Sequence, residues 1–201
     1  GVPVPKFPFI CMTVSGGHTQ LVRIDTPTEM VVLGSTIDDA AGEAFDKTAK
    51  ILGFPYPGGP LIDKYAKEGN PKAFEFPITR MAGVNYSFSG IKTAVLYFLR
   101  DQLQINPKFI EENLPDLCAS IQHTLVQMLL IKLKDAMKEY GVSDADANTY
   151  AAANPYDAAN WRQSIGEQAW VAMFNQGLTS WNFWRRLDFP VLLAPPTAIT
   201  N

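Results

Sequence analysis

The pattern of apolar positions changes near residue 37 from strand-like to helix-like. Residues 7–15 form an apolar run, residues 20–25 alternate between apolar and polar positions, and residues 29–36 are again mostly apolar. Each run has the length and composition of a strand, and glycine or proline separates neighbouring runs. The pattern therefore predicts a three-stranded meander.

From residue 37 onward the apolar positions recur at helical spacing. They predict a helix over residues 37–52 whose core face carries Ile37, Ala41, Ala44, Phe45, Thr48 and Leu52, with Gly53 as its stop. Further helices are expected over residues 61–67, from Ser89 (as N-cap) to about Gln102, and over residues 117–140, with an irregular loop over residues 69–84. The fold class expected from these strands and helices together is α/β.

The break between the first two runs is Ser15-Gly16-Gly17, and it is the first candidate for chemistry. Both glycines can adopt positive φ and can let a ligand approach the backbone closely. Successive N–H groups in such a turn form a concave anion site, to which the hydroxyls of Ser15 and Thr19 can add donors. The two interpretations are a phosphate-holding turn and an ordinary tight turn.

Acidic residues mark the helix that follows. Asp38 and Asp39 lie at its start, where the helix dipole favours negative charge, and Asp39, Glu43 and Asp46 share its outer face. One interpretation is a solvated acidic face. The other is a row of carboxylates that accepts hydrogen bonds from a sugar or a base.

Two later segments carry similar alternatives. Gly58 and Gly59 precede a predicted helix with Asp63 in its first turn, which suits either a ligand or an ordinary capped turn. Lys92 lies in the first turn of the helix after Ser89, where it opposes the dipole and indicates either a bound partner or a surface lysine.

The composition sets limits on partners and compartment. The 201 residues carry a net charge of −3, which gives no electrostatic case for nucleic-acid binding by this chain alone. Cys11 and Cys118 lie in apolar surroundings, so we expect buried free thiols and a cytosolic compartment. His18 and His123 form no metal-ligand spacing, and no signal peptide or membrane-spanning run is expected. The chain starts without Met and is expected to be cut from something longer.

The last third of the chain has a different composition. All four tryptophans lie beyond position 160, and no lysine follows Lys138. The residues between Lys138 and the first tryptophan are mostly small or polar, which is typical of a linker. We therefore predict a region over residues 1–141, a linker over residues 142–160 and a helical, Trp-rich region over residues 161–201.

Four motifs in the first region occur in a distinctive order. They are Val14-Ser15-Gly16-Gly17-His18-Thr19-Gln20-Leu21, Ile37-Asp38-Asp39-Ala40-Ala41-Gly42-Glu43-Ala44-Phe45-Asp46-Lys47, Tyr56-Pro57-Gly58-Gly59-Pro60 and Ser87-Phe88-Ser89-Gly90-Ile91-Lys92-Thr93. Together they resemble the tRNA N6-threonylcarbamoyladenosine transferase family, long called O-sialoglycoprotein endopeptidases. The resemblance covers roughly residues 1–141.

The resemblance implies part of an actin/Hsp70-like ATPase fold and transfer of a threonylcarbamoyl group from its adenylate to N6 of adenosine 37 in certain tRNAs. The implied ligand is ATP or threonylcarbamoyl-adenylate, and the implied partners are tRNA and further subunits of the same machinery. The residues that match the family's adenylate-binding positions are Thr13, Val14, Ser15, Gly16, Gly17, Asp46, Gly59 and Asp63, with Asp39, Glu43, Ser89 and Lys92 as secondary candidates.

The sequence also departs from the family pattern. The family's first lobe, its His-x-x-x-His motif and the glycine-rich segment and metal-binding Asp that follow the long helix are not found. The family uses a divalent iron or zinc ion, and the motifs that supply its ligands are the ones not found here. We therefore expect no metal site in this chain and no transferase activity from it alone. Open sheet edges predict self-association.

The tail resembles a different family. It is similar to the C-terminal part of SusD/RagB-type glycan-binding outer-membrane proteins of Bacteroidetes over about residues 143–201. Two Trp-rich segments carry this resemblance: Asn160-Trp161-Arg162-Gln163-Ser164-Ile165-Gly166-Glu167-Gln168-Ala169-Trp170 and Trp181-Asn182-Phe183-Trp184-Arg185-Arg186-Leu187-Asp188-Phe189-Pro190. A cell-surface family conflicts with a cytosolic one. The alternatives to a transferase fragment are therefore a glycan-binding or scaffold module, a composite chain without one function, and a generic actin-fold sugar kinase.

Overall fold

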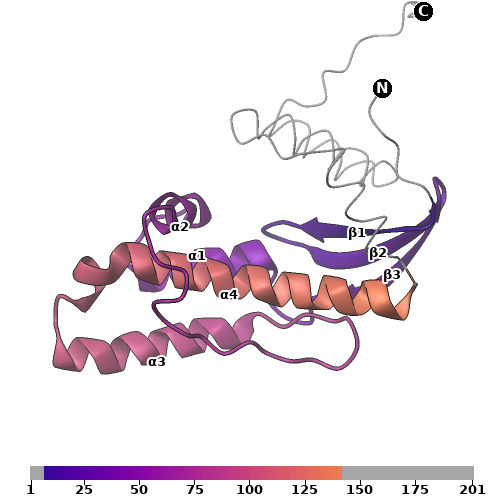
Figure 1. Cartoon of the computed structure of the whole chain (residues 1–201). Coiled ribbons are helices and arrows are strands. Elements are labelled where there is room, and N and C mark those ends of the chain that lie inside the picture. The colour runs from indigo at the N-terminus through magenta and orange to yellow at the C-terminus, as the bar shows by residue number, and fades with distance from the viewer. Residues whose placement is uncertain (1–6, 142–201) are drawn as a thin grey trace, which may run out of the picture. The chain divides into compact units, whose positions relative to one another are not determined.

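The computed structural model describes residues 7–141. The predicted linker and the Trp-rich, SusD-like region lie outside them, so those predictions stay predictions. The described chain contains three strands and four helices in the order β1, β2, β3, α1, α2, α3, α4 (Figure 1).

The three strands form an antiparallel sheet in sequence order, as the meander prediction required. They are β1 (Phe9–Val14), β2 (Thr19–Thr26) and β3 (Glu29–Ser35), and each begins and ends within two residues of its prediction. β2 is the central strand, and its side chains Leu21 and Ile24 are buried. Burial along β2 does not follow a strict period of two, because the buried Leu21 and Ile24 are three residues apart.

Helices α1 (Ala41–Ile51) and α2 (Gly59–Ala66) follow the sheet. The sequence predicted that the first would begin at residue 37, but Ile37 lies before it and is 60% exposed. Residues 36–40 instead cross from β3 to the helix, and Thr36 also forms a parallel bridge with Tyr86. The buried face of α1 is made of Ala41, Ala44, Thr48 and Ala49, where small side chains allow close packing.

Helices α3 (Ser89–Ile105) and α4 (Phe109–Glu139) run alongside each other, and α2 packs on α4 (Figure 1). α4 begins eight residues before the start predicted at residue 117, because the helix continues through a kink. The chain does kink there, since Asn113 has non-helical dihedral angles and Pro115 opens the straight part of the helix. Leu117, Ile121 and Leu125 of α4 are fully buried.

The loop over residues 69–84 is irregular, as predicted, and α4 holds both of its ends. Asn70 donates its backbone N–H to Asp116 Oδ1 at 2.7 Å. Near the other end the buried Lys132 ammonium donates to the carbonyl oxygens of Met81 and Gly83, both at 2.5 Å. A buried ammonium needs such partners, so Lys132 ties the loop to the core.

α4 also bears on the expectation that no segment could span a membrane. By length and composition alone, Phe109–Glu139 is long and apolar enough to do so. Half of its most apolar window is buried inside the protein, however, as in the core helix of a folded domain. Its hydropathy is therefore explained by the packing of α2 and α3 against it.

Candidate functional site

The first glycine turn, residues 15–18, is closed by a serine side chain. Ser15 donates its N–H to the carbonyl of His18 at 2.8 Å, and its Oγ accepts the N–H groups of Gly17 and His18 at 3.2 and 2.9 Å. Neither Gly16 nor Gly17 has positive φ, so the turn does not use the freedom that glycine offers there. The turn is built by hydrogen bonds to Ser15 Oγ and needs no left-handed residue.

The outer face of the first glycine turn is open, while its inner face lies against α1. A Cβ added to Gly16 or Gly17 would meet no atom within 4 Å. On the inner side Gly42 donates its N–H to the Ser15 carbonyl at 3.1 Å, and a Cβ on Gly42 would lie 2.8 Å from the Cα of Gly16. The turn is therefore supported from below and accessible from above.

Thr19 has a different role from the one expected. Its side chain is fully buried, and its Oγ1 accepts the N–H of Ala41 at 2.9 Å. Ala40, the N-cap residue of α1, provides no side-chain hydrogen bond, so Thr19 caps the helix from β2. The expectation that its hydroxyl would serve a ligand was wrong, because the hydroxyl is enclosed. Thr13 and Val14 end β1 and lead into the turn opposite Gln20 and Thr19.

Asp46 lies beside the second glycine turn, residues 57–60. Its Oδ1 accepts the N–H groups of Gly58 and Gly59 at 2.8 and 3.1 Å. A Cβ on Gly58 would lie 2.2 Å from the Cβ of Ala49, so this turn is packed tightly on α1. Gly42 and Asp46 are four residues apart and share one face of α1. That face therefore holds the first glycine turn at one end and the second at the other.

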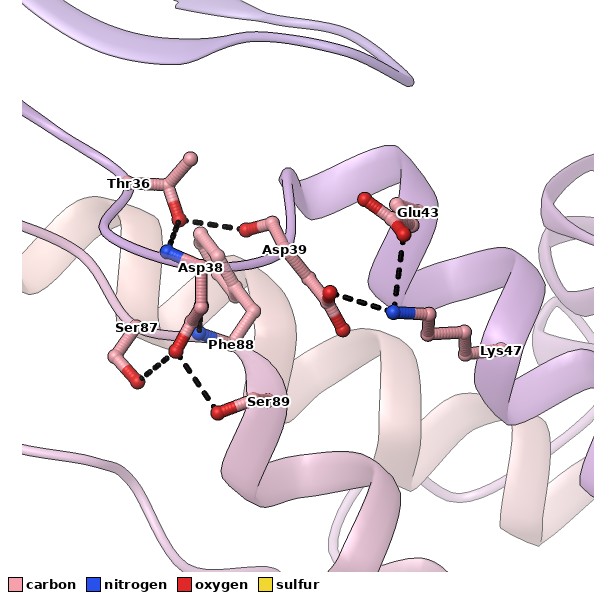
Figure 2. Close-up of polar contacts among 8 residues, drawn as sticks. All are labelled: Thr36, Asp38, Asp39, Glu43, Lys47, Ser87, Phe88 and Ser89. Atoms are coloured by element: carbon pink, nitrogen blue, oxygen red, sulfur yellow. Dashed lines mark hydrogen bonds and ion pairs between the residues drawn. The ribbon is translucent and has the colours of Figure 1, made fainter.

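The predicted row of three acids is divided in the structure. Asp39 and Glu43 both pair with the ammonium of Lys47, at 2.5 and 3.0 Å (Figure 2). Asp46 bonds instead to the second glycine turn. The hydrogen bonds to Asp39 and then to Glu43 raise the pKa of Lys47. Lys47, on the same helix, thus supplies the positive charge that Asp39 and Glu43 require.

Asp38 joins two motifs that are distant in the sequence. Its carboxylate accepts hydrogen bonds from Ser87 Oγ at 2.6 Å, the N–H of Phe88 at 2.8 Å and Ser89 Oγ at 2.8 Å (Figure 2). Desolvation acts to raise the pKa of Asp38, but these hydrogen bonds outweigh it and lower the pKa. Ser89 is not the N-cap of α3, because Phe88 occupies that position and the serine hydroxyl donates to Asp38.

The two remaining candidates lie on exposed helix surfaces. Asp63 belongs to the second turn of α2, not the first, and pairs with Lys67 at 3.2 Å and with Gln122 Nε2 at 3.3 Å. Lys92 is exposed in the first turn of α3 and has no hydrogen bond or ion pair within residues 7–141, so the partner suggested by its position is not found there. The sequence did not predict the contact of Gln122 or the partners of Asp38.

The donor set of the described residues does not fit a metal ion. Over residues 7–141 no group of three or more His, Cys, Asp or Glu side chains is placed to hold one. His18 lies in the first glycine turn and His123 within α4. Burial raises the pKa of Cys11, and it raises the pKa of Cys118 to about 11, so neither thiol favours the thiolate that binds metals.

Comparison with known proteins decides the family. A family model described as TsaD, tRNA N6-adenosine threonylcarbamoyltransferase, matches residues 2–166. The chain belongs to this family. The match includes both glycine turns and the carboxylates of α1, and it continues past the boundary predicted near residue 141. TsaD membership implies an actin/Hsp70-like ATPase type of fold, with which the sheet and helices of the described residues agree.

Three curated relatives, each named tRNA N6-adenosine threonylcarbamoyltransferase, illustrate the similarity. The protein of Christiangramia forsetii is 55% identical over 83% of this chain and 48% of its own length. Those of Cytophaga hutchinsonii and Porphyromonas gingivalis are 63% and 54% identical, each over 69% of this chain and 40% of their own lengths. The chain thus spans less than half the length of these TsaD proteins.

Proposed function

We propose that residues 7–141 carry the adenylate-binding part of a tRNA N6-threonylcarbamoyladenosine transferase. The substrate would be ATP or threonylcarbamoyl-adenylate, and the transfer to tRNA would require the rest of the enzyme. The observation that carries this proposal is the α1 face on which Gly42 supports the first glycine turn and Asp46 supports the second. One helix thereby supports both glycine turns.

The first glycine turn is proposed to hold the phosphate or carbamoyl end of the ligand. Its outer face is open at Gly16 and Gly17, so a ligand can approach the backbone there. The N–H of Gly16 has no hydrogen bond within residues 7–141, and the Ser15 hydroxyl lies beside it. The Gly16 N–H is a donor suited to an anionic oxygen, whereas the Ser15 hydroxyl already donates to the His18 carbonyl at 3.3 Å. Thr13 and Val14 lead the chain to this turn.

Asp46, Gly59 and Asp63 are proposed to hold the ribose and adenine side. Asp46 uses Oδ1 for the second glycine turn, which fixes the carboxylate and leaves Oδ2 with no hydrogen bond within residues 7–141. A carboxylate oxygen held in place in this way is suited to accept a bond from a ribose hydroxyl. Asp39, Glu43, Ser89 and Lys92 are secondary candidates, and Ser89 would act by supporting Asp38.

Calorimetric titration of the 201-residue chain with ADP tests the proposal. Asp46→Asn keeps an acceptor for the second glycine turn but removes the charge, and we expect its ADP affinity to fall by about 10-fold or more, the worth of a charged hydrogen bond. Asp101→Asn, on an exposed pair with Arg100, is the matched control and should bind as the wild type does. No heat of binding with millimolar ADP, or equal affinity in both variants, would contradict the proposal.

We also propose that the chain alone does not transfer the threonylcarbamoyl group. The support is that the described residues assemble no metal ligand set. We further propose that the chain acts in the cytosol, where tRNA is modified, together with tRNA and partner subunits. We also propose that it self-associates through its edge strands β1 and β3. Nucleoside mass spectrometry of tRNA incubated with the purified chain tests the proposed inactivity. Formation of the modified adenosine would disprove it.

A further inference from the structure

Gln122 on α4 has an unusual environment at both ends of its side-chain amide. Its Nε2 donates to the Asp63 carboxylate at 3.3 Å. Its Oε1 is buried and has no hydrogen-bond partner, and it is the only such side-chain oxygen or nitrogen atom over residues 7–141. The amide thus serves Asp63 with one group and leaves the other unsatisfied.

Such an arrangement is unfavourable for stability. A buried acceptor without a partner retains its desolvation cost, which an apolar side chain of similar size would not carry. Reversing the amide would place its oxygen against the carboxylate of Asp63, so the amide is held in the orientation that serves Asp63. A polar group kept at a cost to stability indicates a role in a site.

The hydrogen bond also joins two helices that are firmly packed. Ile62 of α2 and Ile121 of α4 are both fully buried, and each is the neighbour of one of the two bonded residues. The other partner of Asp63 is Lys67, on the same helix, with a side chain 72% exposed, and such surface pairs fix geometry poorly. Gln122 is therefore the contact that orients Asp63 relative to the core.

We propose that Gln122 is a positioning residue for the adenylate site. It holds the carboxylate of Asp63 so that the carboxylate accepts a hydrogen bond from a ligand hydroxyl, and Gln122 itself does not touch the ligand. This inference rests on the proposed function, because Asp63 must belong to the site for its orientation to affect binding.

The test is a double-mutant cycle with the 201-residue chain, titrated with ADP. Gln122→Met removes the hydrogen bond and the unsatisfied oxygen while keeping the shape, so we expect ADP to bind about 3- to 10-fold more weakly, while the urea midpoint stays equal or rises. In the Asp63→Asn background the same change should have no further effect. Gln127→Met, on another face of α4, is the control and should bind ADP as the wild type does.

A second variant gives a signature that a purely structural role would not produce. Gln122→Glu places a carboxylate against Asp63, so ADP affinity relative to the wild type should fall more at about pH 7.5 than at about pH 5, where one carboxylate can take up a proton.

Three results would overturn the inference. They are Gln122→Met binding ADP as tightly as the wild type, loss of affinity in step with loss of stability, and effects that add fully to those of Asp63→Asn. If the wild type binds no ADP, the proposed function fails, and the positioning role fails with it. If the wild type binds ADP and the Gln122 variants bind it equally tightly, only the positioning role is overturned and the proposed function stands.

Discussion

The two glycine turns have similar sequences but opposite surroundings. The first, residues 15–18, has no atom within 4 Å of a Cβ added to Gly16 or Gly17. The second, residues 57–60, has Gly58 packed where a Cβ would lie 2.2 Å from that of Ala49, and its N–H groups are bonded to Asp46. Glycine leaves an open face in the first turn and makes room for a helix in the second.

A glycine can leave the backbone open or allow close packing against another element, and the sequence does not distinguish these two reasons. In the first turn the close approach takes place at Gly42, on the helix beneath, and the turn's own glycines stay open. In the second turn the glycine itself makes the close approach. Substitutions by alanine should therefore affect stability in one turn and ligand binding in the other.

The largest expected effect on stability is that of Gly58→Ala. Its Cβ has no space beside Ala49, so we expect the free energy of unfolding to fall by about 3 kcal/mol, the upper end for overpacking. Gly59→Ala is the matched control, because its Cβ would lie 3.7 Å from the Cβ of Phe45, an ordinary contact. Urea unfolding measures both, and equal stability of the two variants would remove the contrast within this turn.

Gly42→Ala tests the support beneath the first glycine turn. The added Cβ would lie 2.8 Å from the Cα of Gly16 and 2.9 Å from the carbonyl oxygen of Ser15, and both are backbone atoms. We expect a loss of about 2 kcal/mol in the free energy of unfolding, since the turn must shift away from α1. ADP affinity should fall as well. A variant that is as stable as the wild type would show that the turn is not held by this contact.

Asp38→Ala tests whether charge as well as packing holds the motifs together. Loss of its three hydrogen bonds to residues 87–89 should lower the free energy of unfolding by about 1–2 kcal/mol at pH 7, as loss of a helix cap does.

The pH dependence follows from the lowered pKa of Asp38 in the folded state. Its contribution is complete above the ordinary aspartate pKa of about 3.9 and is lost as the pH falls through the folded-state value. The difference between wild type and variant should therefore shrink below about pH 4 in urea unfolding. A difference that is constant from pH 7 to pH 3 would rule out the carboxylate as its cause.

The smallest expected effect on stability is that of Gly16→Ala. Its φ is not positive and a Cβ there would meet no atom, so the free energy of unfolding should change by less than about 0.5 kcal/mol. If the open face receives a ligand, the methyl group should nevertheless weaken ADP binding at least about fivefold. A binding constant equal to that of the wild type would show that the ligand does not approach this face.

Periodicity predicted most of the fold because it reports which side chains meet the core. It predicted the three strands and the approximate positions of the four helices, and the strand order of the sheet is that of the predicted meander. The start of α4 differs from the prediction because the helix continues through a kink, with non-helical angles at Asn113 and with Pro115 inside it.

The candidate site was harder to predict than the fold. The turns and Asp46 could be identified because they lie in motifs, but their partners could not. Thr19 caps a helix 22 residues further along the chain, and Asp38 bonds to residues about 50 positions away. Gln122 carries no local signal, because one glutamine in an amphipathic helix resembles any other. Such contacts depend on tertiary packing, which a local pattern does not report.

The most direct test of the adenylate-site proposal is an amide NMR titration of the 201-residue chain with ADP. We predict that the backbone signals of residues 15–18 and of Gly58 and Gly59 shift together, in proportion to occupancy, because one ligand would contact both turns that α1 aligns. Shifts confined to other parts of the chain, or none at millimolar ADP, would contradict the assignment of these turns to an adenylate site.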